Sequence, residues 1–117
     1  MVVTNPCAPD PRVLRHAVWM HQAGYQVTVH AFDREENHPM SENHHGVRIM
    51  RYRIGKVAYG GTVSTYRGIR RFQRTVLRTL VHDLPAMVYC HDADTLRIGY
   101  ALKQNHGVPF VFDMHDL

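Results

Sequence analysis

Short apolar runs alternate with longer amphipathic stretches along the chain, and each change of period marks a new element. β-branched and aromatic residues fill the apolar runs, which predicts strands at 1–4, 26–31, 47–54, 87–90 and 110–113. Apolar positions three and four residues apart predict helices at 10–24, from 62 to about 83, and at 94–106. Residues 32–46 are polar, contain Pro39 and end in Gly46, so a loop is predicted there.

The ends of the predicted helices carry their own signals. Asp10 suits the N-cap, and Pro11 suits the first helical position, where the missing N–H costs nothing. Thr62, which follows a Gly-Gly pair, offers a second N-cap. Gly24 and Gly107 are natural residues just beyond a helix C-terminus.

The order of elements predicts the fold class. Strands that alternate with helices predict an α/β fold, a Rossmann-like parallel sheet with helices on both faces. The strands at 87–90 (MVYC) and 110–113 (FVFD) are nearly all apolar, which is typical of a parallel sheet covered on both faces. The strand at 47–54 alternates apolar and basic residues, which predicts one buried face near a sheet edge. Because Leu117 follows so soon after the last strand, we expect the chain to be part of a longer protein.

Composition fits one globular domain. The chain has 117 residues, 44% hydrophobic and 21% charged, which argues against a second domain and against disorder. No apolar run approaches the about 20 residues of a membrane span. The only cysteines, Cys7 and Cys90, exclude a disulfide scaffold, and reduced thiols in a cytoplasmic protein are expected. The net charge of +4 suits nucleic acid, anionic lipid or a phosphorylated small molecule equally well.

Three polar clusters follow predicted strands, at the edge where open parallel sheets bind ligands. The first follows the strand at 1–4, the second the strand at 87–90 and the third the strand at 110–113. For Asp10 and Asp94, an N-cap role is the simpler interpretation, whereas His91 and His115 both follow apolar strands at the binding edge. The clusters contain Asn5, Asp10, Arg12, His91, Asp92, Asp94, Asp113, His115 and Asp116.

Four segments resemble one family in the order that family has them. Residues 88–99 (VYCHDADTLRIG) and 107–117 (GVPFVFDMHDL) resemble the N-terminal domain of retaining glycosyltransferases of family 4. Residues 23–29 (AGYQVTV) and 46–49 (GVRI) are similar to two further strand entries of that family. The resemblance covers nearly the whole chain and implies a GT-B enzyme, in which two Rossmann-like domains face each other across a cleft.

The resemblance implies roles for these clusters. Residues 1–117 would be an incomplete N-terminal, acceptor-side domain, inactive alone, and a C-terminal domain absent from this chain would hold the nucleotide-sugar. No cofactor is implied. His115 would be the catalytic histidine that touches the donor sugar. The loop after the first strand reads NPCAPDP where many members have a Gly-Gly pair, so backbone phosphate contacts do not carry over to it. The substrate-binding residues would be Asn5, Asp10, Arg12, His91, Asp92, Asp94 and Asp116.

Two other classes of function stay open. One is a non-catalytic α/β module that binds a phosphorylated ligand or a protein partner. The other is a metal-dependent hydrolase, with ligands drawn from His91, Asp92, Asp94, Asp113, His115 and Asp116, although none of them has a diagnostic metal-ligand spacing. The loop histidines His38, His44 and His45 are better explained as solvated side chains than as metal ligands.

The long predicted helix carries an arginine stripe. Its members recur at i, i+4, i+7 and i+11, which places them on one side of the helix: Arg67, Arg71, Arg74 and Arg78. A solvated face is one interpretation. The other is contact with an anionic membrane surface or a phosphorylated lipid acceptor, which the family resemblance also implies. Nucleic acid is not expected, because the stripe lacks interleaved aromatic residues.

Overall fold

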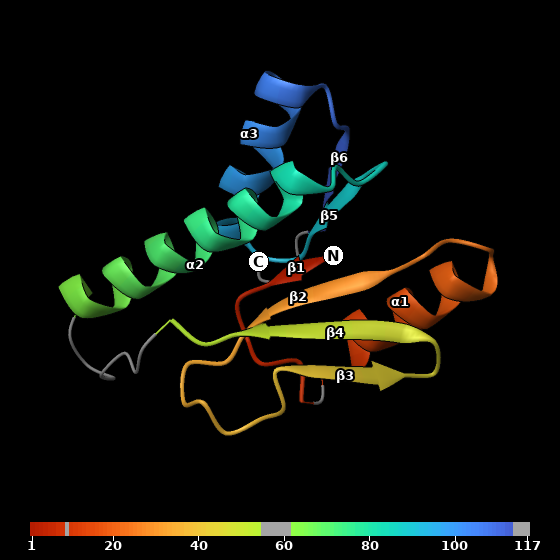
Figure 1. The fold of residues 1–117 in the computed structure, drawn as a ribbon, viewed down its shortest axis with the longest axis horizontal. Helices are drawn as coiled ribbons and strands as arrows, with labels where there is room; N and C mark the ends of the chain where they lie inside the picture. The colour runs from red at the N-terminus through yellow and green to blue at the C-terminus, as the bar shows by residue number, and fades with distance from the viewer. Residues whose placement is uncertain (9, 55–61, 114–117) are drawn as a thin grey trace.

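The computed structural model describes residues 1–8, 10–54 and 62–113, which form a layered α/β domain (Figure 1). The strands are β1 (Val2–Val3), β2 (Thr28–Phe32), β3 (Ser41–His44), β4 (Val47–Tyr52), β5 (Val88–Cys90) and β6 (Phe110–Phe112). The helices are α1 (Pro11–Gln22), α2 (Thr62–His82) and α3 (Leu96–His106), with a 3-10 turn (Ala93–Thr95) before α3.

One sheet joins all the described strands. Its order is β3-β4-β2-β1-β5-β6, and every pairing is parallel except that of β3 with β4. Strands β2 and β4 lie on one side of β1, and the later strands β5 and β6 lie on its other side. The predicted Rossmann-like parallel sheet is therefore confirmed, and its order reverses between β1 and β5.

Helices cover both faces of the sheet, as predicted, and a separate apolar core lies under each. Neighbouring residues of a strand point to opposite faces, so Val3 packs on the α1 side and Val2 on the α2 and α3 side. The α1 core also contains Val13, Leu14, Ala17, Val29, Ala31, Val47 and Ile49. The core beneath α2 and α3 contains Phe32, Tyr52, Phe72, Val76, Leu80, Val88, Ile98 and Leu102.

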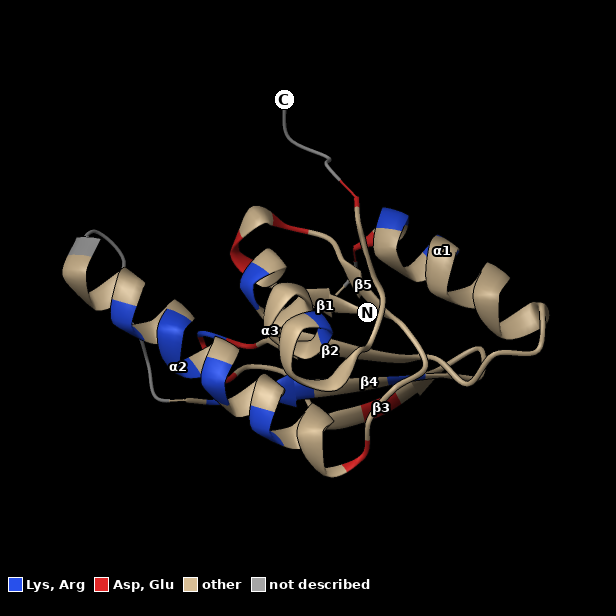
Figure 2. Cartoon of the chain, turned by 90° about the horizontal axis from the view of Figure 1, so that it is seen from above, with Lys and Arg blue, Asp and Glu red and all other residues tan. Residues whose placement is uncertain are grey.

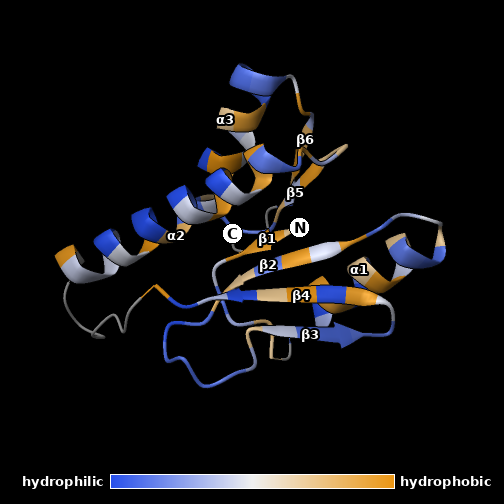
Figure 3. Ribbon diagram, in the orientation of Figure 1, coloured by the Kyte–Doolittle hydropathy of each residue, from blue (hydrophilic) through white to orange (hydrophobic). Residues whose placement is uncertain are grey.

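The predicted loop at 32–46 contains a strand, β3, so that prediction was wrong. Its four residues are polar and mostly exposed, and Figure 3 shows β3 and the segment before it in hydrophilic colours. A two-residue turn joins β3 to β4, and its residues, His45 and Gly46, have φ angles of 49° and 88°. Two positive φ angles define the turn type that suits tight hairpins. Because β3 occupies the edge, β4 lies next to the edge strand, in agreement with its predicted place near a sheet edge.

Burial on two elements also differs from prediction. Arg51 in β4 is 3% exposed, although the alternating pattern suggested a solvated basic residue. In α2, Val76 and Leu80 are buried, whereas Tyr66, which helical spacing places near the same side, is 59% exposed. Phe72 takes the central place instead.

The helix ends mostly follow the sequence signals. Asp10 caps α1, whose first residue is Pro11, and Gly107 adopts a left-handed conformation (φ 68°) after α3. The third helix differs from the prediction, because a 3-10 turn with Asp92 at its N-cap precedes it, and Thr95 rather than Asp94 occupies the N-cap of α3. The Gly-Gly pair before α2 and the side chain of Thr62 lie outside the described residues.

Candidate functional site

The carboxyl ends of two neighbouring strands, β1 and β5, are tied together. One carboxylate oxygen of Asp92, after β5, accepts hydrogen bonds from the backbone N–H and the hydroxyl of Thr4, after β1, at 2.7 and 2.9 Å. The backbone N–H and hydroxyl of Thr95 bond back to the Asp92 carbonyl. Asp92 thus holds the edge together at the point where the strand order reverses, the usual ligand-binding position in such sheets.

The loop between β1 and α1 is held by its own polar side chains. The Asn5 side-chain oxygen accepts from the Cys7 N–H, and its amide group donates to Asp10, both at 2.8 Å. The other Asp10 oxygen accepts from the Val13 N–H at 3.3 Å. Cys7 has a φ of 52°, a conformation usually reserved for glycine. A buried thiol therefore occupies a left-handed position in this loop.

Arg51, in β4, also holds the β1–α1 loop in place. Its guanidinium donates to the carbonyls of Pro6 (2.7 Å), Cys7 (3.0 Å) and Pro39 (3.1 Å). It also pairs with the Glu42 carboxylate at 3.1 Å. Each nitrogen of the buried guanidinium has an acceptor, so Arg51 is a positioning residue that joins the β1–α1 loop to β3.

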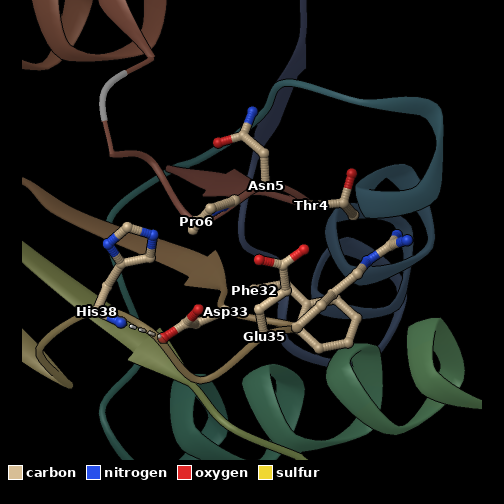
Figure 4. A pocket seen from close by; sticks show the side chains of 8 residues that line it. Thr4, Asn5, Pro6, Phe32, Asp33, Glu35 and His38 are labelled. Atoms are coloured by element: carbon tan, nitrogen blue, oxygen red, sulfur yellow. Dashed lines mark hydrogen bonds between the residues drawn. The ribbon is translucent and has the colours of Figure 1, made fainter. Parts of the chain in front are cut away.

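A pocket of about 380 Å³ opens beside this loop, between the ends of β1 and β2 (Figure 4). Asp33 forms part of its wall and is buried, with its carboxylate accepting from the N–H groups of Asn37 (3.3 Å) and His38 (3.0 Å). Arg53 pairs with Asp33 at 3.7 Å. The lining residues are Thr4, Asn5, Pro6, Phe32, Asp33, Arg34, Glu35 and His38.

Sequence reasoning missed this pocket except for Asn5. Residues 32–38 were assigned to a loop, although they directly follow a strand predicted in the parallel sheet. The carboxyl ends of parallel strands share one edge, so Asp33 and Arg34 belong with the polar residues after β1 and β5. Applied to the predicted strand at 26–31, this rule would have placed the residues that follow it among the candidate site residues.

An aromatic cluster lies on the α1 side of the same edge. The rings of His16 and Tyr89 meet edge to face at 4.4 Å, and the rings of Tyr89 and His91 are 5.3 Å apart. Burial, and then the negative charge of Asp113, raise the pKa of the Tyr89 hydroxyl. The hydroxyl therefore stays protonated at neutral pH and remains a hydrogen-bond donor.

The structure brings most of the described predicted site residues to one edge. Asn5, Asp10, His91 and Asp92 lie in the two loops that Thr4 and Asp92 connect. Both oxygens of Asp10 have internal partners, so its capping role accounts for its place.

The remaining predicted site residues differ from these. Arg12, in the first turn of α1, and Asp94 are exposed, and Asp94 uses its backbone carbonyl to accept from Gln73. His115 and Asp116 lie outside the described residues.

The described residues of this edge contain no metal-ligand cluster and no exposed thiol. Within residues 1–8, 10–54 and 62–113, no group of three or more His, Cys, Asp or Glu side chains is arranged to hold a metal ion. Both cysteines are buried. Burial raises the pKa of the Cys7 thiol to about 11, which leaves almost no thiolate to act as a nucleophile at neutral pH.

The arginine stripe on α2 is exposed as one face. All four of its members, Arg67, Arg71, Arg74 and Arg78, are exposed, and Figure 2 shows basic residues along the length of the helix. Arg70, beside the stripe, instead donates to Gln73 at 2.9 Å. None of the helices in the described part of the chain is both long and apolar enough to cross a bilayer.

Comparisons with known proteins agree with the fold. The family model of the glycosyl transferase 4-like domain matches residues 8–117. Among solved structures, a sucrose-phosphate synthase from Thermosynechococcus elongatus is similar, with a TM-score of 0.79 and 14% identity over 99% of this chain. The chain spans 32% of the length of that protein, and at this identity the likeness concerns the fold alone. No curated protein matches the sequence.

Proposed function

The chain belongs to the glycosyl transferase 4-like family, and from this premise we propose that it is the acceptor-side domain of a retaining hexosyltransferase. The donor is a nucleotide-sugar, a co-substrate bound by a second domain outside residues 1–117. The acceptor is a carbohydrate or a lipid-linked sugar, and the protein is cytoplasmic. The family match over residues 8–117 carries this proposal.

The proposed reaction exchanges one bond at the anomeric carbon of the donor sugar. The bond from this carbon to the diphosphate oxygen breaks, and the nucleoside diphosphate leaves with the electron pair. The acceptor hydroxyl oxygen bonds to the same carbon, and its proton passes to the departing diphosphate. The reacting carbon becomes electron-poor, so hydrogen-bond acceptors beside the sugar favour the step.

The polar edge of the sheet supplies such acceptors. We propose that His91, Asp92 and Asp94 line the acceptor side, with Asp116, and that His115 is the catalytic residue beside the donor sugar. Asn5 faces the donor from the β1–α1 loop, and Asp10 and Arg12 face it from the start of α1. Support comes from the position of the two described loops at the strand-order reversal, where hydrogen bonds from Thr4 to Asp92 join them.

Removing the His115 ring tests this assignment. In the full-length protein, His115→Ala is expected to lower kcat at least about tenfold, which corresponds to about 1.4 kcal/mol of transition-state stabilisation. Release of nucleoside diphosphate from a panel of nucleotide-sugars measures turnover, and thermal unfolding measures stability. The matched control is His106→Ala, an exposed histidine at the end of α3, which should change neither. A large loss of melting temperature with normal activity per folded molecule would make His115 structural.

We also propose that the α2 stripe attaches the enzyme to an anionic membrane surface. Support comes from four exposed arginines on one helix face, each worth about 1 kcal/mol beside an acidic leaflet. Arg71→Glu combined with Arg74→Glu should abolish sedimentation with vesicles that contain anionic lipid. Because exposed charges are screened beyond about 10 Å at 0.1 M salt, added salt should also release the unmodified protein.

The control for this experiment reverses equal charge elsewhere. Arg15 and Arg97 are exposed on α1 and α3, so Arg15→Glu combined with Arg97→Glu changes the net charge equally without touching the stripe. Retained vesicle binding in this control supports a dedicated surface on α2. Equal loss in both double variants would show diffuse attraction to the whole basic protein.

A further inference from the structure

Arg34 lines the pocket, and none of the hydrogen bonds and ion pairs among the described residues involves its side chain. It follows β2 directly, and it lines the pocket between the ends of β1 and β2. Its Nε atom is buried and has no hydrogen-bond partner among the described residues, and none of the ion pairs found there involves Arg34. Buried donors in native proteins nearly always have an acceptor, so this atom calls for one from outside the described chain.

The two carboxylates beside Arg34 are directed elsewhere. Both oxygens of Asp33 accept backbone N–H groups, and Arg53 pairs with the same carboxylate. Glu35 is exposed and accepts from the Asn37 side chain at 3.1 Å. Neither carboxylate therefore neutralises the Arg34 guanidinium.

The guanidinium is also held in place. Its central carbon lies 5.2 Å from the centre of the Phe32 ring, within the range of a cation–π contact. Phe32 is fully buried and stacks on Phe72 with ring centres 4.9 Å apart and planes 5° apart. A long side chain resting on a fixed ring loses less freedom when it binds a ligand.

We propose that Arg34 binds an anionic group, a phosphate or a carboxylate, carried by the acceptor in this pocket. The planar guanidinium matches both groups with paired N–H donors. The volume of about 380 Å³ suits a ligand of sugar-phosphate size, and Asn5 and His38 line the rest of the wall for hydroxyl groups. Naming the ligand an acceptor rests on the proposed function, whereas the anion site itself rests on the pocket.

The Nε–H nuclear magnetic resonance signal of Arg34 reports directly on this site. In the full-length protein, inorganic phosphate should shift this signal in a saturable way. Glucose 6-phosphate and glucuronate, as the phosphate and carboxylate arms, should bind at least tenfold more tightly than glucose. Arg34→Gln should weaken binding of the preferred anion at least tenfold, and Arg34→Lys should restore part of it because charge returns without the fork of donors.

The control is Arg48→Gln. Arg48 is exposed and pairs in register with Thr28, at the opposite end of β2 from Phe32, so its loss should leave anion binding unchanged. Three outcomes would overturn the inference: no saturable shift with any anion, equal binding of glucose and its phosphate, or unchanged affinity in Arg34→Gln. If Arg34→Gln weakened uridine diphosphate and spared the sugar anions, the phosphate would belong to the donor and the acceptor assignment would be wrong.

The same experiment separates this inference from the proposed function. If the protein binds anions through Arg34 but consumes no nucleotide-sugar, the proposed transferase function is wrong and the proposed anion site stands. If the protein transfers sugar to an anionic acceptor and Arg34→Gln does not change that transfer, the proposed anion site is wrong and the proposed transferase function stands.

Discussion

Arg51→Leu is expected to lower the free energy of unfolding by about 3–5 kcal/mol, the usual cost of breaking a buried charged network from one side. The substitution leaves the carbonyls of Pro6, Cys7 and Pro39 without their donor, and Glu42 without its counterion. Typical domains have a total stability of about 5–15 kcal/mol, so a large share is at stake. Urea denaturation followed by circular dichroism measures the loss.

Arg48→Leu is the matched control on the same strand. Arg48 is exposed and lies three residues before Arg51, so its replacement should change stability by no more than about 0.5 kcal/mol. Arg51→Lys keeps the charge but cannot reach all the acceptors, and it should fall between the two. Equal losses for Arg48→Leu and Arg51→Leu would mean that the carbonyl contacts contribute nothing.

Phe72→Ala is expected to cost about 3–5 kcal/mol, because a fully buried aromatic ring is replaced by a cavity. The ring stacks on Phe32 and meets Tyr52 edge to face at 5.7 Å, so its loss removes support from two strands. Phe32 in turn carries the Arg34 guanidinium. Thermal or urea unfolding measures the loss, and phosphate affinity should fall as well because the ring beneath Arg34 is no longer held.

Tyr66→Ala provides the comparison on the same helix. Tyr66 is 59% exposed, so removing its ring should cost at most about 0.5 kcal/mol. A larger loss for Tyr66→Ala than for Phe72→Ala would reverse the assignment of the buried face of α2.

The elements recovered from sequence are those whose signals are local. Helix α1 shows the Asp10 cap and Pro11 in consecutive letters, and Gly107 marks the end of α3 in the same way. The apolar runs of β5 and β6 reflect burial on both faces of a parallel sheet. Alternation of such elements leaves few topologies, which is why the sheet could be predicted from sequence.

The features missed depend on contacts between distant residues. Strand β3 has no apolar face, because it lies at the sheet edge with polar side chains, and only its turn carried a hairpin signal. Arg51 is buried because three carbonyls from two other segments converge on it, and its own neighbourhood shows none of them. The pocket likewise combines the ends of β1 and β2, which become neighbours only in the folded sheet.

The place of β1 inside the sheet has consequences for how the chain reaches its native state. Strand β1 is synthesised before the other described strands, yet it pairs with β5 at Val2 and Cys90, and the Thr4–Asp92 bond spans 88 residues. Closing so long a loop is slow, so we expect this step to limit the folding rate. During synthesis, β2 becomes available to pair with β1 long before β5 emerges. Until then, the other edge of β1 is unpaired and can form hydrogen bonds with other chains. Strand β1, which has a partner on both sides in the folded sheet, thus has an unpaired edge while the chain is still on the ribosome.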